Sequence, residues 1–261
     1  MIWEHHLDPV ILSLGPLQMR WYGLMYVVGF VAGFFVLRKL SREKILSLNE
    51  EQIDTMLFYI FVGLFLGARI FFVFVYNWPY YSDHPAEIIA FWRGGLSFHG
   101  GLLGFVIAFI LLSRKFDVPF WNIADAACVA APIGIAAVRI GNFMNGELYG
   151  RFTDGTWGVI FPEGGPMPRH PSQLYEAFFE GICLFVILFS LRGKLSQARL
   201  SALFLICYGI FRFGLEFFRQ PDIQLGFVLL EFFSMGQVLC FLMIVSGCIL
   251  WFYHRPLRSE R

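Results

Sequence analysis

A run of polar side chains follows a long apolar stretch in the middle of the sequence. Arg139 and Asn142 are three residues apart, so on a helix they share one face. Asn145, Glu147 and Gly150 come soon after them, and glycine lets a backbone approach a ligand closely. An arginine with amide donors beside it can bind a phosphate group. The alternative is an Arg–Glu pair that only caps a helix.

A second polar group lies on a later apolar stretch. Tyr208, Arg212 and Glu216 are spaced four residues apart, so they lie along one helix stripe, and Arg219 follows. A buried structural Arg–Glu pair is the alternative. Arg139 and Arg212 lie in apolar stretches without a matching excess of acids, which indicates an anionic partner from outside the chain. A phospholipid headgroup is the candidate.

Three further sites are less specific. His99 is flanked by glycines, and a histidine with its ordinary pKa of about 6.5 can accept a proton at neutral pH, although a structural role is the alternative. Tyr22 opens the first apolar stretch, where an aromatic anchor at the membrane surface is the alternative. Ser172 is expected to cap the helix that begins there, with Glu176 adding charge to its first turns.

Several kinds of chemistry have no motif in this sequence. It contains no P-loop, no HExxH and no paired aspartates, so we predict neither a bound metal nor a cofactor. The five cysteines lie in apolar runs without metal-ligand spacing and are expected to be buried apolar side chains. A net charge of +1 gives no basic field for nucleic acid.

The composition identifies the elements that must hold these residues. Hydrophobic residues make up 57% and charged residues 15%, whereas a soluble domain is about half apolar and a quarter charged. Several apolar runs approach the roughly 20 residues that cross a bilayer, which excludes a soluble enzyme, a disordered tail and a disulfide scaffold. We predict an all-α integral membrane protein, a single polytopic domain over residues 1–261. About seven transmembrane helices are expected, roughly at 19–37, 55–76, 96–113, 121–141, 174–191, 200–218 and 228–253.

The basic residues between these spans predict the orientation. One side carries every lysine of the chain and half of the arginines: Arg38, Lys39, Arg42, Lys44, Arg114, Lys115, Arg192, Lys194, Arg199, Arg255, Arg258 and Arg261. The positive-inside rule makes this side cytoplasmic, so the N-terminus is expected outside and the C-terminus inside. The segment 142–173, rich in glycine and proline, is then expected to form a small cap on the outer side.

The motifs, taken in order, resemble those of the bacterial prolipoprotein diacylglyceryl transferases. The resemblance rests on residues 8–10 (Asp8-Pro9-Val10), 21–26, 97–101, 139–150, 169–176 and 216–222. It implies transfer of the diacylglyceryl group from phosphatidylglycerol to the lipobox cysteine of a prolipoprotein, with formation of a thioether and release of glycerol phosphate. It also implies a multi-pass protein of the bacterial inner membrane whose active site faces the periplasm.

The resemblance suggests roles for the candidate residues. Arg139 and Arg212 are expected to bind the headgroup phosphate, with Asn142 and Glu147 ordering the following loop and contacting the glycerol. Asn145, Gly150 and Arg219 are further candidates for substrate binding, and Tyr22 and Tyr208 for lining the lipid cleft. His99 is the first candidate for the base that takes the thiol proton, and Glu216 or Glu147 is the alternative.

Two other functions stay open at this point. A transporter or flippase for anionic phospholipids would use the same arginines, but it would need polar groups at several depths along a path. The candidate residues are instead concentrated near the outer side. A structural scaffold would leave the glycine-flanked His99 and Tyr22 without an explanation.

Overall fold

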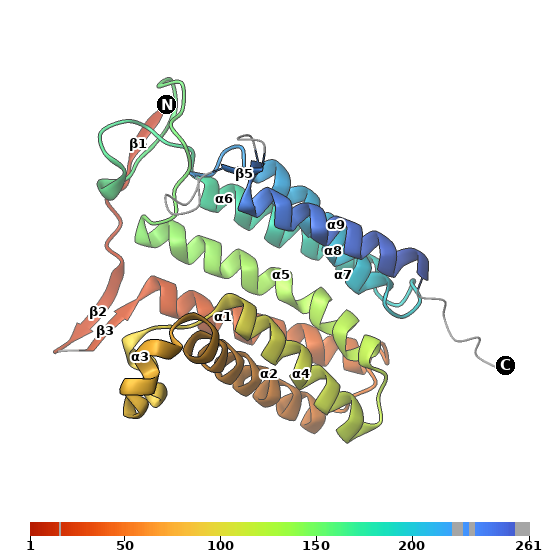
Figure 1. Cartoon of the computed structure of the whole chain (residues 1–261). Coiled ribbons are helices and arrows are strands. Elements are labelled where there is room, and N and C mark those ends of the chain that lie inside the picture. Colours follow the sequence, from red (N-terminus) through yellow and green to blue (C-terminus); the bar gives the residue numbers. More distant parts are fainter. Residues whose placement is uncertain (16, 221–226, 230–232, 254–261) are drawn as a thin grey trace. The chain divides into compact units, whose positions relative to one another are not determined.

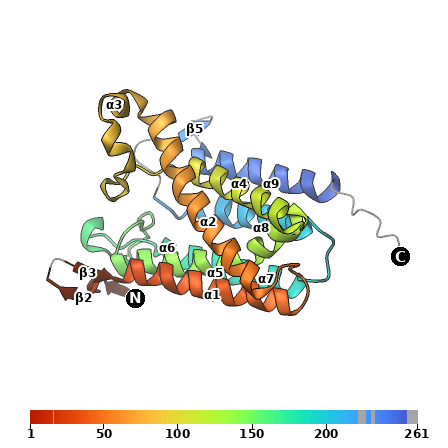
Figure 2. The same cartoon turned by 90° about the horizontal axis from the view of Figure 1, so that it is seen from below.

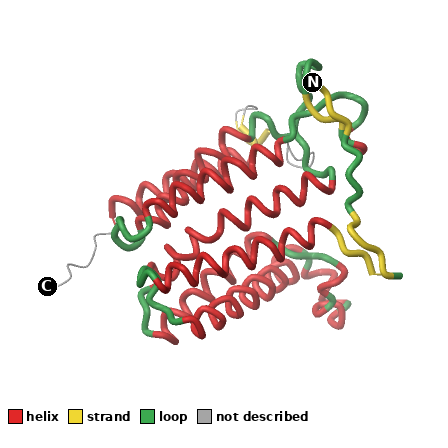
Figure 3. The backbone as a smooth tube through the Cα atoms, turned by 180° about the vertical axis from the view of Figure 1, so that it is seen from behind, coloured by secondary structure: helices red, strands yellow, loops and turns green. Residues whose placement is uncertain are grey.

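The computed structural model describes residues 1–15, 17–220, 227–229 and 233–253 (Figure 1). Most of them are helical, and Figure 3 separates the long helices from three short pairs of strands. The long helices are α1 (Trp21–Arg42), α2 (Glu50–Phe71), α4 (Phe98–Phe116), α5 (Phe120–Asn145), α8 (Arg199–Leu215) and α9 (Met235–Tyr253). A further helical stretch combines α6 (Ser172–Glu176), the π-helix η5 (Ala177–Cys183) and α7 (Leu184–Leu191).

The prediction of an all-α membrane protein is confirmed. Six helical stretches of the described residues are long and apolar enough to cross a membrane: 21–42, 50–76, 98–116, 120–145, 172–191 and 235–253. The predicted span at 200–218 corresponds to α8, which has 17 residues. The count of seven and the orientation of the termini stay predictions. Arg255, Arg258 and Arg261, which support that orientation, lie outside the described residues, as do Pro221 and Asp222 of the last motif.

The chain divides into two compact units, of which one comprises Arg38–Ala124. Its helices α2 and α4 cross in close backbone contact (Figure 2) because Gly63 and Gly67 face Gly100 and Gly104. A Cβ on Gly67 would lie 2.8 Å from the Gly104 Cα. This is the spacing of small residues that lets membrane helices approach each other. Asn49 starts α2 with a capping box completed by Gln52.

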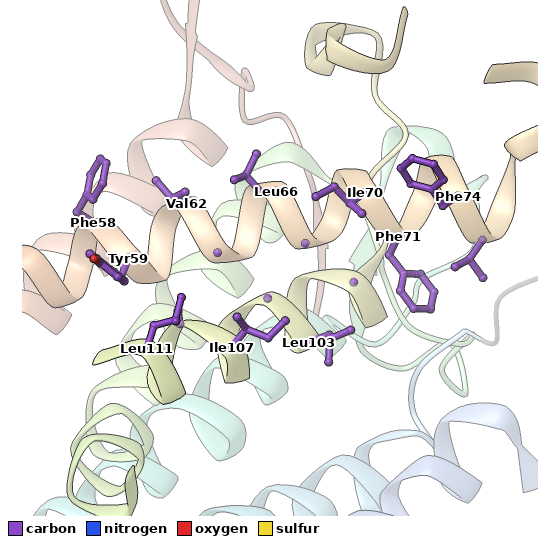
Figure 4. A pocket seen from close by; sticks show the side chains of 16 residues that line it. Phe58, Tyr59, Val62, Leu66, Ile70, Phe71, Phe74, Leu103, Ile107 and Leu111 are labelled. Carbon is purple, nitrogen blue, oxygen red and sulfur yellow. The ribbon is translucent and has the colours of Figure 1, made fainter. Parts of the chain in front are cut away.

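An apolar groove of about 580 Å³ runs along α2 and α4 (Figure 4). Phe58, Leu66 and Ile70 line it from α2, and Leu103 and Ile107 from α4. Most of these side chains are exposed, as expected for helix faces that contact lipid tails.

A turn region beyond α2 is held by a single buried arginine. It contains the π-helix η1 (Phe72–Tyr76), α3 (Trp78–Asp83) and two short 3₁₀ turns, η2 (Pro85–Ile89) and η3 (Phe91–Arg93). Arg69, which is 3% exposed, donates hydrogen bonds to the carbonyl oxygens of Glu87, Ile88 and Gly94 at 2.7–2.8 Å. These bonds fix the loop that leads into α4.

The other unit comprises Met1–Leu37 and Asp125–Arg261. In it α8 and α9 pack side by side, and α1 packs on α5 where a Cβ on Gly29 would lie 3.0 Å from the Gly134 Cα. Strand β1 (Ile2–Glu4) pairs in parallel with β4 (Gly158–Ile160), and the buried His5 donates to the Phe143 carbonyl at 2.7 Å. The N-terminal arm is therefore part of the cap.

The remaining strands form two hairpin-like pairs. Strand β2 (Val10–Leu14) pairs with β3 (Leu17–Arg20), and β5 (Phe227–Leu229) pairs with β6 (Phe233–Ser234), both antiparallel. None of these strands was predicted. They have two to five residues each, too few for an alternating pattern to be recognised.

Two local predictions at the cap need correction. Helix α5 continues to Asn145, so Asn142 and Asn145 lie in its last turns, and the non-helical cap starts later than the predicted 142. Ser172 does not cap α6: Pro171 occupies the N-cap position, and the Ser172 hydroxyl donates to the Leu148 carbonyl at 3.3 Å. The serine therefore ties the helix to the cap.

Candidate functional site

Five charged side chains meet inside the unit that contains the cap. Arg139 comes from α5, Arg212 from α8, Glu176 from the end of α6 and Glu180 from η5, and Glu216 follows α8 as its C-cap. The three glutamates are 2%, 0% and 6% exposed, and the side chains of the two arginines 19% and 12%. We call these five residues the ionic cluster.

Glu176 connects the two arginines. Its Oε2 lies 2.7 Å from the Arg139 Nε, and its Oε1 lies 3.4 Å from the Arg212 Nη1. Glu216 lies 3.2 Å from the other terminal nitrogen of Arg212. Because one carboxylate holds a guanidinium from each of two helices, it fixes the spacing between them.

Glu180 is placed differently. Its Oε1 lies 3.5 Å from the Arg212 Nη1, and its Oε2 lies 3.9 Å from the Arg139 Nη2. The π-helix that carries it packs on α5: a Cβ on Gly181 would lie 2.8 Å from the Ala136 Cα. This close approach of η5 to α5 lets the Glu180 side chain reach both arginines.

The sequence argument that the arginines lack acidic partners is therefore wrong. Three buried carboxylates lie within 4 Å of the two guanidiniums. Glu180 was not among the predicted site residues, and Glu176 was expected only to add charge to a helix start. Their spacing of four residues inside an apolar span was the available signal, because carboxylates at membrane depth need partners.

Arg139 keeps part of its hydrogen-bonding capacity. Its Nε lies 2.7 Å from Glu176 and its Nη2 lies 3.9 Å from Glu180, but no hydrogen bond from either terminal nitrogen to a described residue is found. The guanidinium thus has one edge bound to a carboxylate and two terminal nitrogens available. Such an edge fits two oxygens of a phosphate group.

A second group of polar residues surrounds Glu147, just after α5. Its carboxylate accepts from the side-chain amides of Asn142 at 2.9 Å and Asn145 at 3.3 Å. Its backbone carbonyl accepts from the Gln173 amide at 2.6 Å. The sequence analysis brought Asn142, Asn145 and Glu147 together correctly as a group, and it missed Gln173, which stands beside Ser172 in a motif that had been noted.

The side-chain amide oxygens of this group lack hydrogen-bond donors, whereas Arg139 has donors without acceptors. The carbonyl oxygens of Asn142, Asn145 and Gln173 are buried and have no hydrogen-bond partner among the described residues. Each amide donates one N–H to Glu147, and its carbonyl oxygen is left without a donor. A ligand with hydroxyl groups would satisfy such acceptors.

Tyr22 and Tyr208 lie on helices of the same unit. A Cβ on Gly141 would lie 3.2 Å from the Tyr22 Cα, so Tyr22 packs against the helix turn that carries Asn142. Its hydroxyl is 3.0 Å from that of Tyr26. Tyr208 stacks on Phe204, one turn before Arg212.

Gly150 and Arg219 join the cap to the end of α8. The two residues form an antiparallel bridge through their backbones, and a Cβ on Gly150 would lie 2.7 Å from the His170 carbonyl oxygen. Arg151 donates to the Arg219 carbonyl at 2.9 Å. Gly150 therefore fits a place where two backbones leave no room for a side chain.

His170 lies beside this bridge, outside the membrane-spanning segments. Its ring contacts Trp157 and Phe218, and the Tyr175 hydroxyl lies 3.3 Å from its Nδ1. Burial lowers the pKa of the His170 imidazole, and the Asp154 carboxylate opposes this shift in part. The neutral ring is thus the favoured form in the folded cap.

His99 belongs to the unit Arg38–Ala124, where it lies in the first turn of α4. Its Nδ1 is 3.0 Å from the Tyr76 hydroxyl, and its side chain is exposed. That His99 serves the same reaction as the arginines stays a prediction. No group of three or more metal-binding side chains is found in the described ranges, and the absence of a metal also stays a prediction.

Comparison with known proteins identifies the family. The family model for prolipoprotein diacylglyceryl transferase matches residues 9–253. The chain belongs to this family. The match covers every residue of the ionic cluster and of the Glu147 group, and nothing in the comparisons supports the transporter alternative.

Individual relatives of this transferase family are similar over nearly their whole length. The phosphatidylglycerol–prolipoprotein diacylglyceryl transferase of Geobacter sulfurreducens is 47% identical over 93% of this chain and 93% of its own. That of Nitratidesulfovibrio vulgaris is 47% identical over 94% and 93%. That of Francisella tularensis subsp. novicida is 44% identical over 96% and 94%.

Proposed function

We propose that this chain transfers the diacylglyceryl group from phosphatidylglycerol to the thiol of the lipobox cysteine of prolipoproteins. A thioether forms and glycerol phosphate is released, which is the first step of bacterial lipoprotein maturation. The family match over residues 9–253 carries this proposal, and the relatives named above are named for this donor and acceptor.

The ionic cluster fits the chemistry of this transfer. Attack by sulfur on the glyceryl carbon breaks a C–O bond and converts a phosphodiester monoanion into a phosphate monoester. Negative charge therefore grows on the leaving phosphate in the transition state. Arg139, with Arg212 nearby, would bind that phosphate more tightly as the charge grows, which lowers the barrier.

The carboxylates make this arrangement rigid before the lipid arrives. Glu176 fixes the Nε edge of Arg139 and touches Arg212, while Glu216 holds Arg212 from the other side. Donors that are already oriented need no reorganisation during the reaction. We assign the phosphate to the free terminal nitrogens of Arg139.

The remaining candidates surround the headgroup and the lipid. Asn142, Asn145 and Glu147 would contact the glycerol, and Gly150 and Arg219 would close the cap over it. Tyr22 and Tyr208 would line the lipid cleft. His99 is the first candidate for the group that deprotonates the thiol, and Glu216 or Glu147 is the alternative.

The membrane setting is part of the proposal. The chain is a multi-pass membrane protein, and we place it in the bacterial inner membrane with its active site toward the periplasm. We treat residues 1–261 as one functional domain, with a cap that begins after α5 and extends to about residue 173. Labelling of single cysteines introduced into the cap, in intact cells, by a reagent that does not cross membranes tests the placement.

Activity is tested with purified protein in detergent, phosphatidylglycerol and a short lipobox peptide, with EDTA present. We expect glycerol phosphate release that needs both the peptide thiol and Arg139. If phosphatidylglycerol binds but no glycerol phosphate is released in any condition, the transferase assignment is wrong and transport becomes the better hypothesis.

A further inference from the structure

Glu180 is the one carboxylate of the ionic cluster that the roles proposed so far do not use. It is 0% exposed, and its Oε2 is buried without a hydrogen-bond partner among the described residues. The Arg139 Nη2 lies 3.9 Å from this oxygen. That nitrogen belongs to the free edge to which the phosphate has been assigned.

The charges of the cluster do not balance. Two guanidiniums face three carboxylates, a formal excess of one negative charge. The groups that face Glu180 are Arg139 on α5, Glu176 one turn before it, Arg212 and Tyr208 on α8, and Cys240 on α9. Tyr208 and Cys240 are neutral when protonated and do not change the count.

A phosphodiester would increase this imbalance. A phosphate oxygen on the Arg139 Nη2 would lie close to the Glu180 Oε2, because that oxygen is only 3.9 Å from the same nitrogen. Two anions at such a distance in a buried site repel each other strongly. A proton on the carboxyl group would remove one charge and supply the hydrogen-bond donor that the phosphate oxygen needs.

We propose that Glu180 takes up a proton when the phosphodiester of phosphatidylglycerol binds, and that its Oε2 then donates a hydrogen bond to the phosphate. Glu176 is less suited to this role because each of its oxygens already faces a guanidinium. The inference rests on the proposed function, in which Arg139 binds the phosphate. The same hydrogen bond strengthens as charge grows on the leaving group, so the neutral acid also favours the transition state.

Binding of short-chain phosphatidylglycerol in detergent tests the proposal across about pH 6 to about pH 9. For the wild-type protein we expect affinity to fall by up to about tenfold per pH unit above the pH at which lipid-free Glu180 ionises. Glu180→Gln should bind with an affinity that no longer depends on pH, because the amide stays neutral and can donate. Glu163→Gln, an exposed position of the cap outside the ionic cluster, is the control and should keep the wild-type slope.

Calorimetry of the wild-type protein gives a second measurement that does not depend on a variant. Binding heats in two buffers of different ionisation enthalpy, at about pH 8, should show uptake approaching one proton per lipid. Absence of uptake would overturn the proposal, and so would a Glu180→Gln protein that keeps the wild-type slope.

Binding to Arg139→Ala and proton uptake distinguish an error in the phosphate assignment from an error in the role of Glu180. If Arg139→Ala binds phosphatidylglycerol as tightly as the wild type does, the phosphate assignment itself is wrong. If binding needs Arg139 but takes up no proton, only the role of Glu180 is wrong.

Discussion

Two regions of this protein bury an arginine, and they use it in opposite ways. All three nitrogens of Arg69 donate hydrogen bonds to backbone carbonyl oxygens of one loop, with N···O distances of 2.7–3.4 Å. Arg139 faces a carboxylate through Nε and keeps its two terminal nitrogens free of hydrogen bonds to the described residues. Arg69 thus holds a loop in place, whereas the geometry of Arg139 leaves donors for the ligand that we propose it binds.

The largest effect should come from removing either arginine of the ionic cluster. We expect Arg139→Ala and Arg212→Ala each to lower the rate of glycerol phosphate release by about 100-fold or more, as loss of oxyanion donors does in other enzymes. Arg139→Lys keeps the charge beside Glu176 but lacks the planar edge, so it should stay strongly impaired while folding normally. Near-normal turnover of Arg212→Ala would remove that residue from the phosphate site.

Removing Arg69 should destabilise the fold instead. Arg69→Met leaves several buried carbonyls without a donor, at about 1–3 kcal/mol for each group. We expect a clearly lower Tm in detergent and a lower yield, with turnover per folded molecule nearly unchanged. An Arg69→Met protein with the wild-type Tm but no activity would break the contrast between the two arginines.

A smaller effect should follow from a change behind the ionic cluster. In Gly181→Ala the new methyl group meets Ala136 of α5, and overpacking of this kind costs about 1–3 kcal/mol. The turn that carries Glu180 would shift relative to the arginines. We expect a loss of about 1.4 kcal/mol of transition-state stabilisation, which corresponds to roughly tenfold slower transfer. Gly214→Ala on α8 is the matched control: its Cβ would meet nothing within 4 Å, so transfer should be unchanged.

The smallest expected effect is a change of the Tm with pH. Burial lowers the pKa of His170 in the folded cap, so the unfolded chain binds more protons than the folded chain as pH falls through about 6.5. The contribution of His170 to stability is complete above that pH and decreases toward lower pH. We expect the Tm of the wild type to fall slightly between about pH 7 and about pH 5, and His170→Gln to reduce this dependence. An identical pH dependence of the Tm in both proteins would show that ionisation of His170 does not affect the stability of the folded protein.

The sequence was sufficient for the long helices and for placing several candidate residues together. Long apolar runs are read easily because a membrane helix must be apolar along its whole length. The spacing of Arg139, Asn142 and Glu147, and of Tyr208, Arg212 and Glu216, predicted side chains that the structure does bring into one unit. What spacing along one helix could not reveal was the partner on another helix. Glu180 stands between aromatic and apolar residues, and only the packing of η5 on α5 shows which arginines it meets.

The π-helix at Ala177–Cys183 makes the length of this segment matter more than its composition. A π-turn closes its hydrogen bond one residue later than an α-turn does. Deleting one residue there would allow an ordinary α-turn, in which one residue fewer separates the two ends of the segment. Glu176 and Glu180 would then be three residues apart instead of four, and the distances from their carboxylates to the two arginines would change. Phe178 and Phe179, in contrast, are exposed and can be exchanged for other apolar residues. We therefore expect functional variants of this protein to differ freely in those two side chains but to keep the number of residues between the two glutamates.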